Sequence, residues 1–216
     1  MNETLTEKNL ADWNIAVGIG RLALAFSRVN RVTYHEDGVT LESDTDHSIM
    51  LALLGVQFCP PHLDPNLVMA FSVVHDLPEV KCGDVSTLGI SAEGLAAKKV
   101  REAEALKDLC AEHPGPIADL MARYEAQVEP EARFVKTLDK VLPKVTHMLN
   151  QCKSVVEHGL TYEEFAASHE KQFANYSKEY ADCPEALELL RVSMVVTQKI
   201  YLSLCPTKST TSPTIS

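Results

Sequence analysis

An adjacent histidine and aspartate, His75 and Asp76, stand inside an apolar stretch and are followed closely by Pro78 and Glu79. Neighbouring side chains on a helix point about 100° apart, so both can face one ligand only where the helix ends and the backbone turns. Pro78 favours such an end because it has no N–H for the carbonyl of Val74 and its ring crowds that turn. Taken alone, the pair is most simply an ion pair at a helix end.

Two further residues extend this pair into a metal-binding pattern. His47 lies upstream in an apolar helical stretch, and Asp139 lies downstream on an apolar stripe. Two imidazoles and two carboxylates suit a first-row divalent ion better than calcium. A carboxylate such as Asp139 is costly to bury without a partner, and a cation is the simplest partner. The pattern therefore indicates a metal centre, with Glu79 emerging one turn after His75 and beside it.

The amino-acid composition limits the classes of protein to which the chain could belong. The chain has 216 residues, 45% of them hydrophobic, which suits one globular domain over residues 1–205. Residues 206–216 form a polar tail that we expect to be disordered. The formal net charge of −10 argues against a nucleic-acid polymer as partner, because such a surface needs a basic stripe. A small anionic ligand is compatible with this net charge, because a bound cation dominates the electric field around its own site.

Cysteine usage and hydropathy point to the cytoplasm. The six cysteines are scattered without a CxxC pair, which indicates neither a disulfide framework nor a zinc ribbon. The N-terminus has no apolar segment typical of a signal peptide, and no apolar run approaches the ~18 residues of a membrane span. We therefore expect a soluble, cytoplasmic protein with no membrane partner.

Helical periodicity dominates the chain, and no strand pattern of weight appears, so the predicted fold class is all-α. Residues 29–38 read as a connection with a turn at Asp37-Gly38, and residues 80–89 read as a loop over the site. Pro143 is expected to kink the helix over 131–157 or to occupy a tolerated bend. The predicted helices cover residues 6–28, 44–58, 65–75, 91–112, 117–127, 131–157, 161–180 and a last segment from residue 184.

These motifs resemble the HD superfamily of metal-dependent phosphohydrolases, and most closely its small 5′-deoxynucleotidases. The resemblance spans residues 29–150. It implies a compact helical HD bundle with additional C-terminal helices, acting on nucleotides. The segments that carry it are Asn30-Arg31, residues 42–48, residues 75–84 with the spacing His-Asp-x-x-Glu-(x)4-Asp, and residues 134–140.

Carried over by position, the resemblance implies one divalent metal ion (Mn, Co, Fe, Ni, Zn or Mg). It makes Arg31 the arginine that holds phosphate, although a solvated loop arginine is the simpler interpretation from spacing alone. Glu79 matches the catalytic acid, and Asp84 an acid near the nucleotide sugar. The branch commonly has tryptophan where this chain has Val32, so an aromatic side chain is missing there or comes from elsewhere, for example Tyr34. The implied metal ligands are His47, His75, Asp76 and Asp139.

Three functions remain open at this point. The first is a 5′-nucleotidase that hydrolyses (deoxy)nucleoside 5′-monophosphates. The second is a (deoxy)nucleoside triphosphate hydrolase releasing triphosphate or pyrophosphate, which basic residues such as Lys81, Lys98 and Lys99 would favour. The third is a helical scaffold with a structural metal, against which Glu79 stands as an acid that a structural site does not need. A homodimer is a further possibility, because the first and last helices look apolar over much of their surface.

Overall fold

The computed structural model describes residues 6–86 and 90–204, and the tail expected over 206–216 lies outside them. Its described part is helical apart from one short hairpin, which confirms the all-α class. The elements in chain order are α1 (Glu7–Phe26), β1 (Asn30–Tyr34), β2 (Leu41–Ser43), α2 (Asp44–Gln57), α3 (Pro65–Val74), α4 (Glu79–Cys82), α5 (Ala92–Glu112), α6 (Pro116–Ala126), α7 (Pro130–Asp139), α8 (Leu142–Leu149), α9 (Lys153–Glu157), α10 (Tyr162–Glu179) and α11 (Pro184–Leu204).

Local sequence signals fix most helix starts. Thr6, Ser43 and Thr161 each form a capping box. In this motif the side chain of the cap residue accepts a hydrogen bond from the backbone N–H of the third helical residue, and the side chain of that third residue accepts one from the backbone N–H of the cap. Proline occupies the first helical position of α3 after the capping residue Asp64. The predicted starts near residues 44, 65 and 161 are therefore confirmed.

The sequence analysis missed a β-hairpin within residues 30–43. β1 and β2 pair antiparallel, with Asn30 opposite Ser43 and Tyr34 opposite Leu41. The expected turn is present, because Gly38 adopts a φ of +65° and its N–H donates to His35 O at 3.0 Å. Two strands this short give too few alternating positions to be recognised in sequence. Their consequence is local: β1 carries Arg31, and β2 runs directly into α2.

The helix predicted over residues 131–157 is three helices in the structure. α7 ends at Asp139 and α8 begins at Leu142, so the expected kink at Pro143 is a break. Pro143 has no N–H for the carbonyl of Asp139, four residues earlier, and its ring excludes a continuous helix there. Cys152, whose φ of 56° lies in the left-handed region, separates α9 from α8. The break leaves Asp139 at a helix C-terminus.

The predicted loop over residues 80–89 is partly wrong. Glu79–Cys82 forms the one-turn helix α4, which ends where Gly83 takes a φ of +72°. Two successive turns connect the end of α3 to α4. Leu77 N donates to Val74 O, and Val80 N donates to Leu77 O. Residues 87–89 lie outside the described part. Glu79 is therefore held on a helical turn directly after the His-Asp pair.

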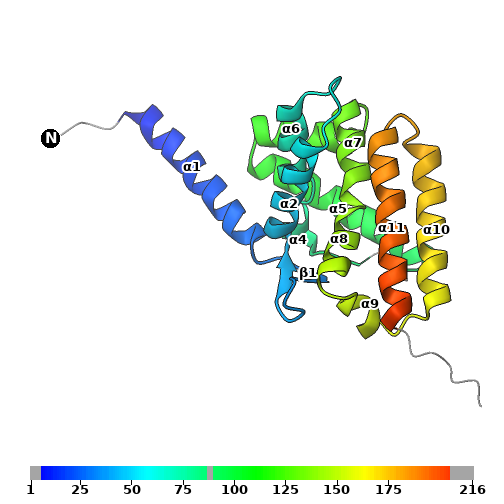
Figure 1. Ribbon diagram of the computed structural model, residues 1–216. Coiled ribbons are helices and arrows are strands. Elements are labelled where there is room, and N and C mark those ends of the chain that lie inside the picture. Colours follow the sequence, from blue (N-terminus) through cyan, green and yellow to red (C-terminus); the bar gives the residue numbers. More distant parts are fainter. Residues whose placement is uncertain (1–5, 87–89, 205–216) are drawn as a thin grey trace, which may run out of the picture.

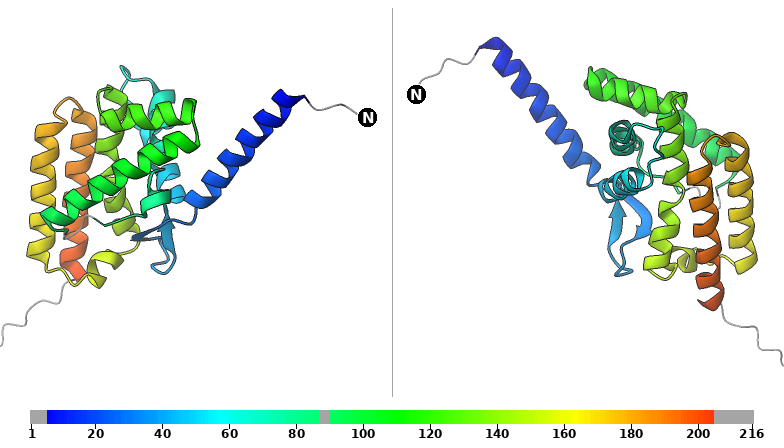
Figure 2. Two further views of the ribbon diagram at one scale, coloured as in Figure 1. Left: turned by 180° about the vertical axis from the view of Figure 1, so that it is seen from behind. Right: turned by 45° about the horizontal axis from the view of Figure 1, so that its top comes forward.

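The main core lies where α2, α3 and α7 pack together and α11 covers them. Leu51, Phe71, Leu138 and Leu190 are fully buried members of it. α10 and α11 lie side by side as an antiparallel pair, while α1 projects away from the body and joins it near its C-terminal end (Figures 1 and 2). Among the described helices, none combines the length and hydropathy needed to cross a membrane.

Candidate metal centre

Three buried residues converge where α2, α3 and α7 pack together. His47 comes from α2, His75 caps the end of α3, and Asp139 ends α7. Asp139 Oδ1 lies 2.8 Å from His47 Nε2 and 3.9 Å from His75 Nε2, and the three side chains are almost wholly buried. One ligand atom from each falls within 4.8 Å of the others, so the group could hold a metal ion.

The two histidines present the nitrogen that a metal needs. His75 Nδ1 donates to the Ser72 carbonyl at 2.8 Å, which leaves Nε2 as the nitrogen facing Asp139. That Nε2 is buried and makes no hydrogen bond. A buried ring nitrogen without a hydrogen-bond partner, beside a carboxylate and a second imidazole, fits a first-row divalent ion. The donor set therefore matches the implied cofactor.

Asp76, which follows His75 in the chain, lies next to this group. Its Oδ2 lies 3.0 Å from His75 Nε2 and 2.8 Å from Arg31 Nη1. Burial alone would raise the pKa of Asp76, but His75 and Arg31 hold it well below its usual range. The carboxyl is therefore ionised at neutral pH and able to act as a ligand. All four sequence-predicted ligands are thus neighbours, with Asp76 at the rim.

Glu42 lies behind His47 and was not singled out from the sequence. Glu42 Oε1 accepts from His47 Nδ1 at 2.8 Å, while Thr33 donates its hydroxyl to the other carboxylate oxygen. Burial alone would lower the pKa of His47, but hydrogen bonds to Asp139 and Glu42 raise it to about 9. A carboxylate on the far nitrogen fixes the ring orientation of a metal-binding histidine.

We expect Glu42→Gln to weaken binding of a divalent ion by about 10–100-fold, because the amide no longer anchors His47 as an anion does. Titration of the purified variant with Mn²⁺ measures this. Glu36→Gln, an exposed change on the same hairpin, is the control. Equal affinities in all three proteins would contradict the anchoring role of Glu42.

Arg31 is brought next to the centre by β1. Its Nη1 donates to Asp76 Oδ2 at 2.8 Å and to Asp44 Oδ1 at 2.9 Å, and lies 3.8 Å from Glu79 Oε2. Burial opposes its charge, but Asp76 and the neighbouring acids raise the pKa of Arg31 further above its ordinary value. Arg31 is therefore a largely buried cation rather than the solvated loop charge that spacing favoured.

Asp44, the first residue of α2, is a second residue that the sequence analysis did not assign to the site. Its carboxylate is fully buried beside Arg31 and groups with Asp76 and Glu79. Burial raises the pKa of Asp44 to about 6, while Arg31 acts in the opposite direction. Only its place at the hairpin–helix junction, which sequence did not reveal, turns it inward.

Glu79 groups with Asp44 and Asp76, separately from the group of His47, His75 and Asp139. It is 4% exposed, and burial together with the nearby charges of Asp76 and Asp44 raises its pKa to about 10. Lys98 of α5 approaches Glu79 Oε1 at 3.4 Å and Asp84 Oδ1 at 3.9 Å. Its ammonium also donates to Val85 O at 2.9 Å, which ties the segment after α4 to α5. A carboxyl that keeps its proton at neutral pH is suited to general-acid chemistry.

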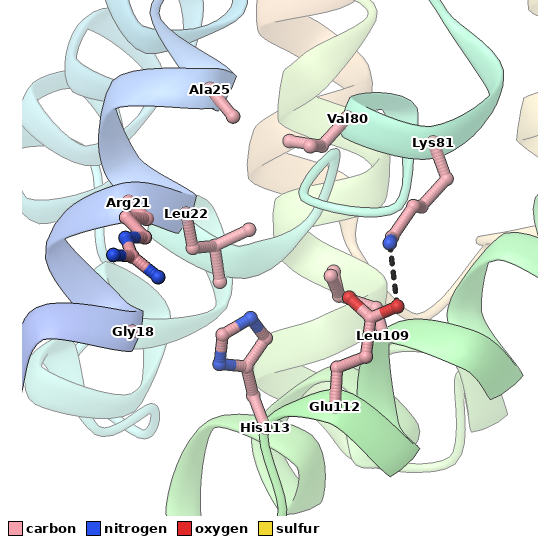
Figure 3. Close-up of a pocket in the computed structure, with 9 residues that line it drawn as sticks. All are labelled: Gly18, Arg21, Leu22, Ala25, Val80, Lys81, Leu109, Glu112 and His113. Atoms are coloured by element: carbon pink, nitrogen blue, oxygen red, sulfur yellow. Dashed lines mark hydrogen bonds and ion pairs between the residues drawn. The ribbon is translucent and has the colours of Figure 1, made fainter. Parts of the chain in front are cut away.

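Several residues considered from the sequence lie away from this centre. Lys81 and Glu112 line a surface cavity of about 320 Å³ between α1, α4 and α5. Figure 3 shows their side chains pointing toward each other and paired. Lys99 is exposed on α5. The Tyr34 hydroxyl donates to Glu157 of α9 at 2.7 Å. Lys81, Lys99 and Tyr34 therefore do not contact the metal group.

Comparison with solved structures supports the same architecture. A protein described as a predicted metal-dependent phosphohydrolase, from Magnetospirillum magnetotacticum MS-1, superposes with a TM-score of 0.63 over 86% of this chain and 95% of that chain. At 20% identity, this likeness concerns the fold alone.

Curated relatives share a part of the sequence. 5′-deoxynucleotidase HDDC2 of Bos taurus is 32% identical over 104 residues, which is 46% of this chain and 49% of that protein. The Homo sapiens protein of the same name is 31% identical over the same length, and the Xenopus laevis protein is 29% identical over 57% of this chain and 56% of that protein. The chain therefore spans about half the length of the curated relatives it matches.

The family itself is shown over most of the chain. The model of the HD domain matches residues 26–181, which run from the last residue of α1 past the end of α10. That span includes His47, His75, Asp76 and Asp139. This chain belongs to the HD domain family.

Proposed function

We propose that this protein is a metal-dependent phosphohydrolase acting on nucleotides, and specifically a 5′-nucleotidase. Its reaction would convert (deoxy)nucleoside 5′-monophosphates to nucleoside and phosphate. The observation that carries the proposal is the buried group His47, His75 and Asp139 with Arg31 and Glu79 at its edge. Partial identity to proteins named 5′-deoxynucleotidase supports the substrate class.

Each side chain has a separate task in this proposal. His47, His75, Asp76 and Asp139 would hold one divalent ion, which when bound would supply Lewis-acid chemistry and lower the pKa of water. Arg31 neutralises charge on the phosphoryl oxygens, for which its fork of donors is suited. Glu79 gives its proton to the leaving 5′-oxygen. Asp84, on the segment after α4, faces the sugar.

A second candidate is hydrolysis of (deoxy)nucleoside triphosphates. Lys98 favours it, since its ammonium lies beside Glu79 and Asp84 and would meet additional phosphates. Against it, Lys98 is already engaged by these acids and by Glu102 at 3.2 Å. A purely structural metal does not explain why the buried Glu79 and the guanidinium of Arg31 lie next to the ligands.

A panel of nucleoside mono-, di- and triphosphates, with Mn²⁺, Co²⁺ or Mg²⁺, separates these functions. Release of orthophosphate and nucleoside from monophosphates is the expected result, and the most active ion identifies the preferred metal. Triphosphate or pyrophosphate as product would favour the second candidate. Loss of the fold on chelation without hydrolysis of any nucleotide would return the metal to a structural role.

We expect Arg31→Ala to lower kcat/KM for a nucleoside monophosphate by about 10–100-fold, because a charge-assisted contact to phosphate is worth roughly 1.5–3 kcal/mol. Bound metal should be retained, since Arg31 is not a ligand. Steady-state kinetics with metal analysis measures both. Arg28→Ala, at an exposed position just before β1, is the matched control. Unchanged kinetics in Arg31→Ala would remove it from the phosphate site.

We also propose that residues 1–205 form one HD-type domain in the cytoplasm. Support comes from α11, whose Leu190 and Met194 share the core of α3 and α7, and from free thiols at buried or half-buried cysteines. The cysteines concerned are Cys59, Cys82, Cys110 and Cys183.

A homodimer built on α1 is the remaining part of the proposal. Trp13 and Ile15 are 66% and 65% exposed on a helix that leaves the body of the molecule (Figure 2). Helix segments without tertiary contacts are marginal in water, so a second copy would stabilise this one. Light scattering is expected to give twice the chain mass, and Trp13→Glu to give the monomer. A monomeric wild-type protein at micromolar concentration would contradict the dimer.

A further inference from the structure

A metal ion held by His75 and Asp76 would compete with Arg31 for one oxygen of Asp76. Asp76 Oδ2 accepts from Arg31 Nη1 at 2.8 Å, and it is also the Asp76 oxygen 3.0 Å from His75 Nε2. If Asp76 turns this oxygen to a cation held beside His75, its bond to Arg31 is weakened or lost. A buried guanidinium must then keep its charge satisfied by another acceptor.

Asp44 is the acceptor already in position. Its Oδ1 lies 2.9 Å from the same Nη1, whereas the nearest Glu79 oxygen, Oε2, lies 3.8 Å away. Asp44 is the first residue of α2 and is 0% exposed, and Ser43 and Asp46 form the capping box there. The Asp44 side chain is therefore not needed to cap the helix.

We propose that Asp44 is a positioning residue that holds Arg31 when Asp76 serves as a metal ligand, and so permits the cation and Arg31 to occupy adjacent places. This inference rests on the proposed function for its metal, but not on any particular substrate. Without Asp44, Arg31 would bind Asp76 alone and oppose the metal by competition and by uncompensated positive charge. Both effects have the same sign, so loss of Asp44 weakens metal binding.

A competing explanation is that Asp44 merely places a negative charge at the N-terminus of α2, where the helix dipole favours it. Asp46 occupies the same turn, contacts Ser43 and His35, and has no hydrogen bond to Arg31. The two aspartates therefore form a matched pair for substitution. Removing Arg31 distinguishes the explanations further, because the dipole is indifferent to it.

The test is titration of the metal-free full chain with Mn²⁺ alone, without a nucleotide. We expect Asp44→Ala to weaken Mn²⁺ binding about tenfold or more, Asp44→Asn to weaken it less, and Asp46→Ala to stay within about twofold of wild type. The double variant Asp44→Ala/Arg31→Ala should recover most of the lost affinity, since the competing cation is gone. Thermal melting of each variant accounts for any loss of folded protein.

Three results would overturn the proposal. They are Mn²⁺ affinity unchanged in Asp44→Ala, an equal loss in Asp46→Ala, and no recovery in the double variant. Because no turnover is measured, absence of nucleotidase activity in the wild type would reject the proposed function while leaving this coupling to be judged. A wild-type chain that binds no Mn²⁺ or Co²⁺ would reject both.

Discussion

Glu79→Gln is expected to lower turnover of a nucleoside monophosphate by about 100-fold or more, with metal and substrate still bound. The amide keeps the shape of the side chain but cannot give a proton to the leaving 5′-oxygen. Burial and the charges of Asp76 and Asp44 raise the pKa of Glu79 to about 10, so wild-type Glu79 carries the proton at neutral pH. Alkoxide is a poor leaving group, and its departure therefore depends on that proton.

A comparison of leaving groups isolates this role. p-Nitrophenolate needs no proton to depart, so p-nitrophenyl phosphate should lose far less activity in Glu79→Gln than the nucleotide. Single-turnover measurements keep chemistry rate-limiting for both substrates. Glu102→Gln serves as the control, because Glu102 also pairs with Lys98 but, unlike Glu79, does not group with Asp44 and Asp76. Equal losses on both substrates, with full metal occupancy, would assign Glu79 to orienting water.

Much of the site could be predicted because its residues lie at places with strong local signals. Pro78 marks the end of α3 at the His-Asp pair, and Pro143 ends α7 at Asp139 four residues before it. Both prolines act on the backbone through the missing N–H, which needs no knowledge of tertiary structure. The capping box at Ser43 likewise fixes the start of α2 and hence the inward face that carries His47.

The supporting residues could not be predicted in the same way. Glu42 and Asp44 flank the junction between β2 and α2, where side-chain direction depends on a hairpin too short to give a periodic signal. In the sequence, both are acidic residues at the start of a predicted helix, and no local pattern marks them as buried. Their burial is set by the pairing of β1 with β2, which turns Arg31 and Thr33 toward them. Long-range strand pairing is the information that a local reading lacks.

Asp139→Asn should release the metal ion, with an affinity loss above about 100-fold and loss of turnover. Asp139 Oδ1 is the atom that lies near both ring nitrogens, at 2.8 Å from His47 Nε2 and 3.9 Å from His75 Nε2. Asparagine offers a neutral oxygen in its place. Asp76→Asn should act in the same direction, because it removes the anionic ligand beside His75. Metal content by mass spectrometry and Mn²⁺ titration are the measurements.

Stability has to be separated from metal loss in this experiment. Asp139 Oδ2 also accepts from Lys140 Nζ at 2.7 Å, so Asp139→Asn leaves a cation without its partner carboxylate. Lys140→Gln isolates that cost, since it breaks the pair and keeps the ligand. Asp182→Asn, which removes an exposed carboxylate paired with Arg133, sets the baseline. If Asp139→Asn and Lys140→Gln melt at similar temperatures but Asp139→Asn alone loses Mn²⁺, Asp139 binds the ion. Full metal occupancy and wild-type turnover in Asp139→Asn would remove it from the ligand set.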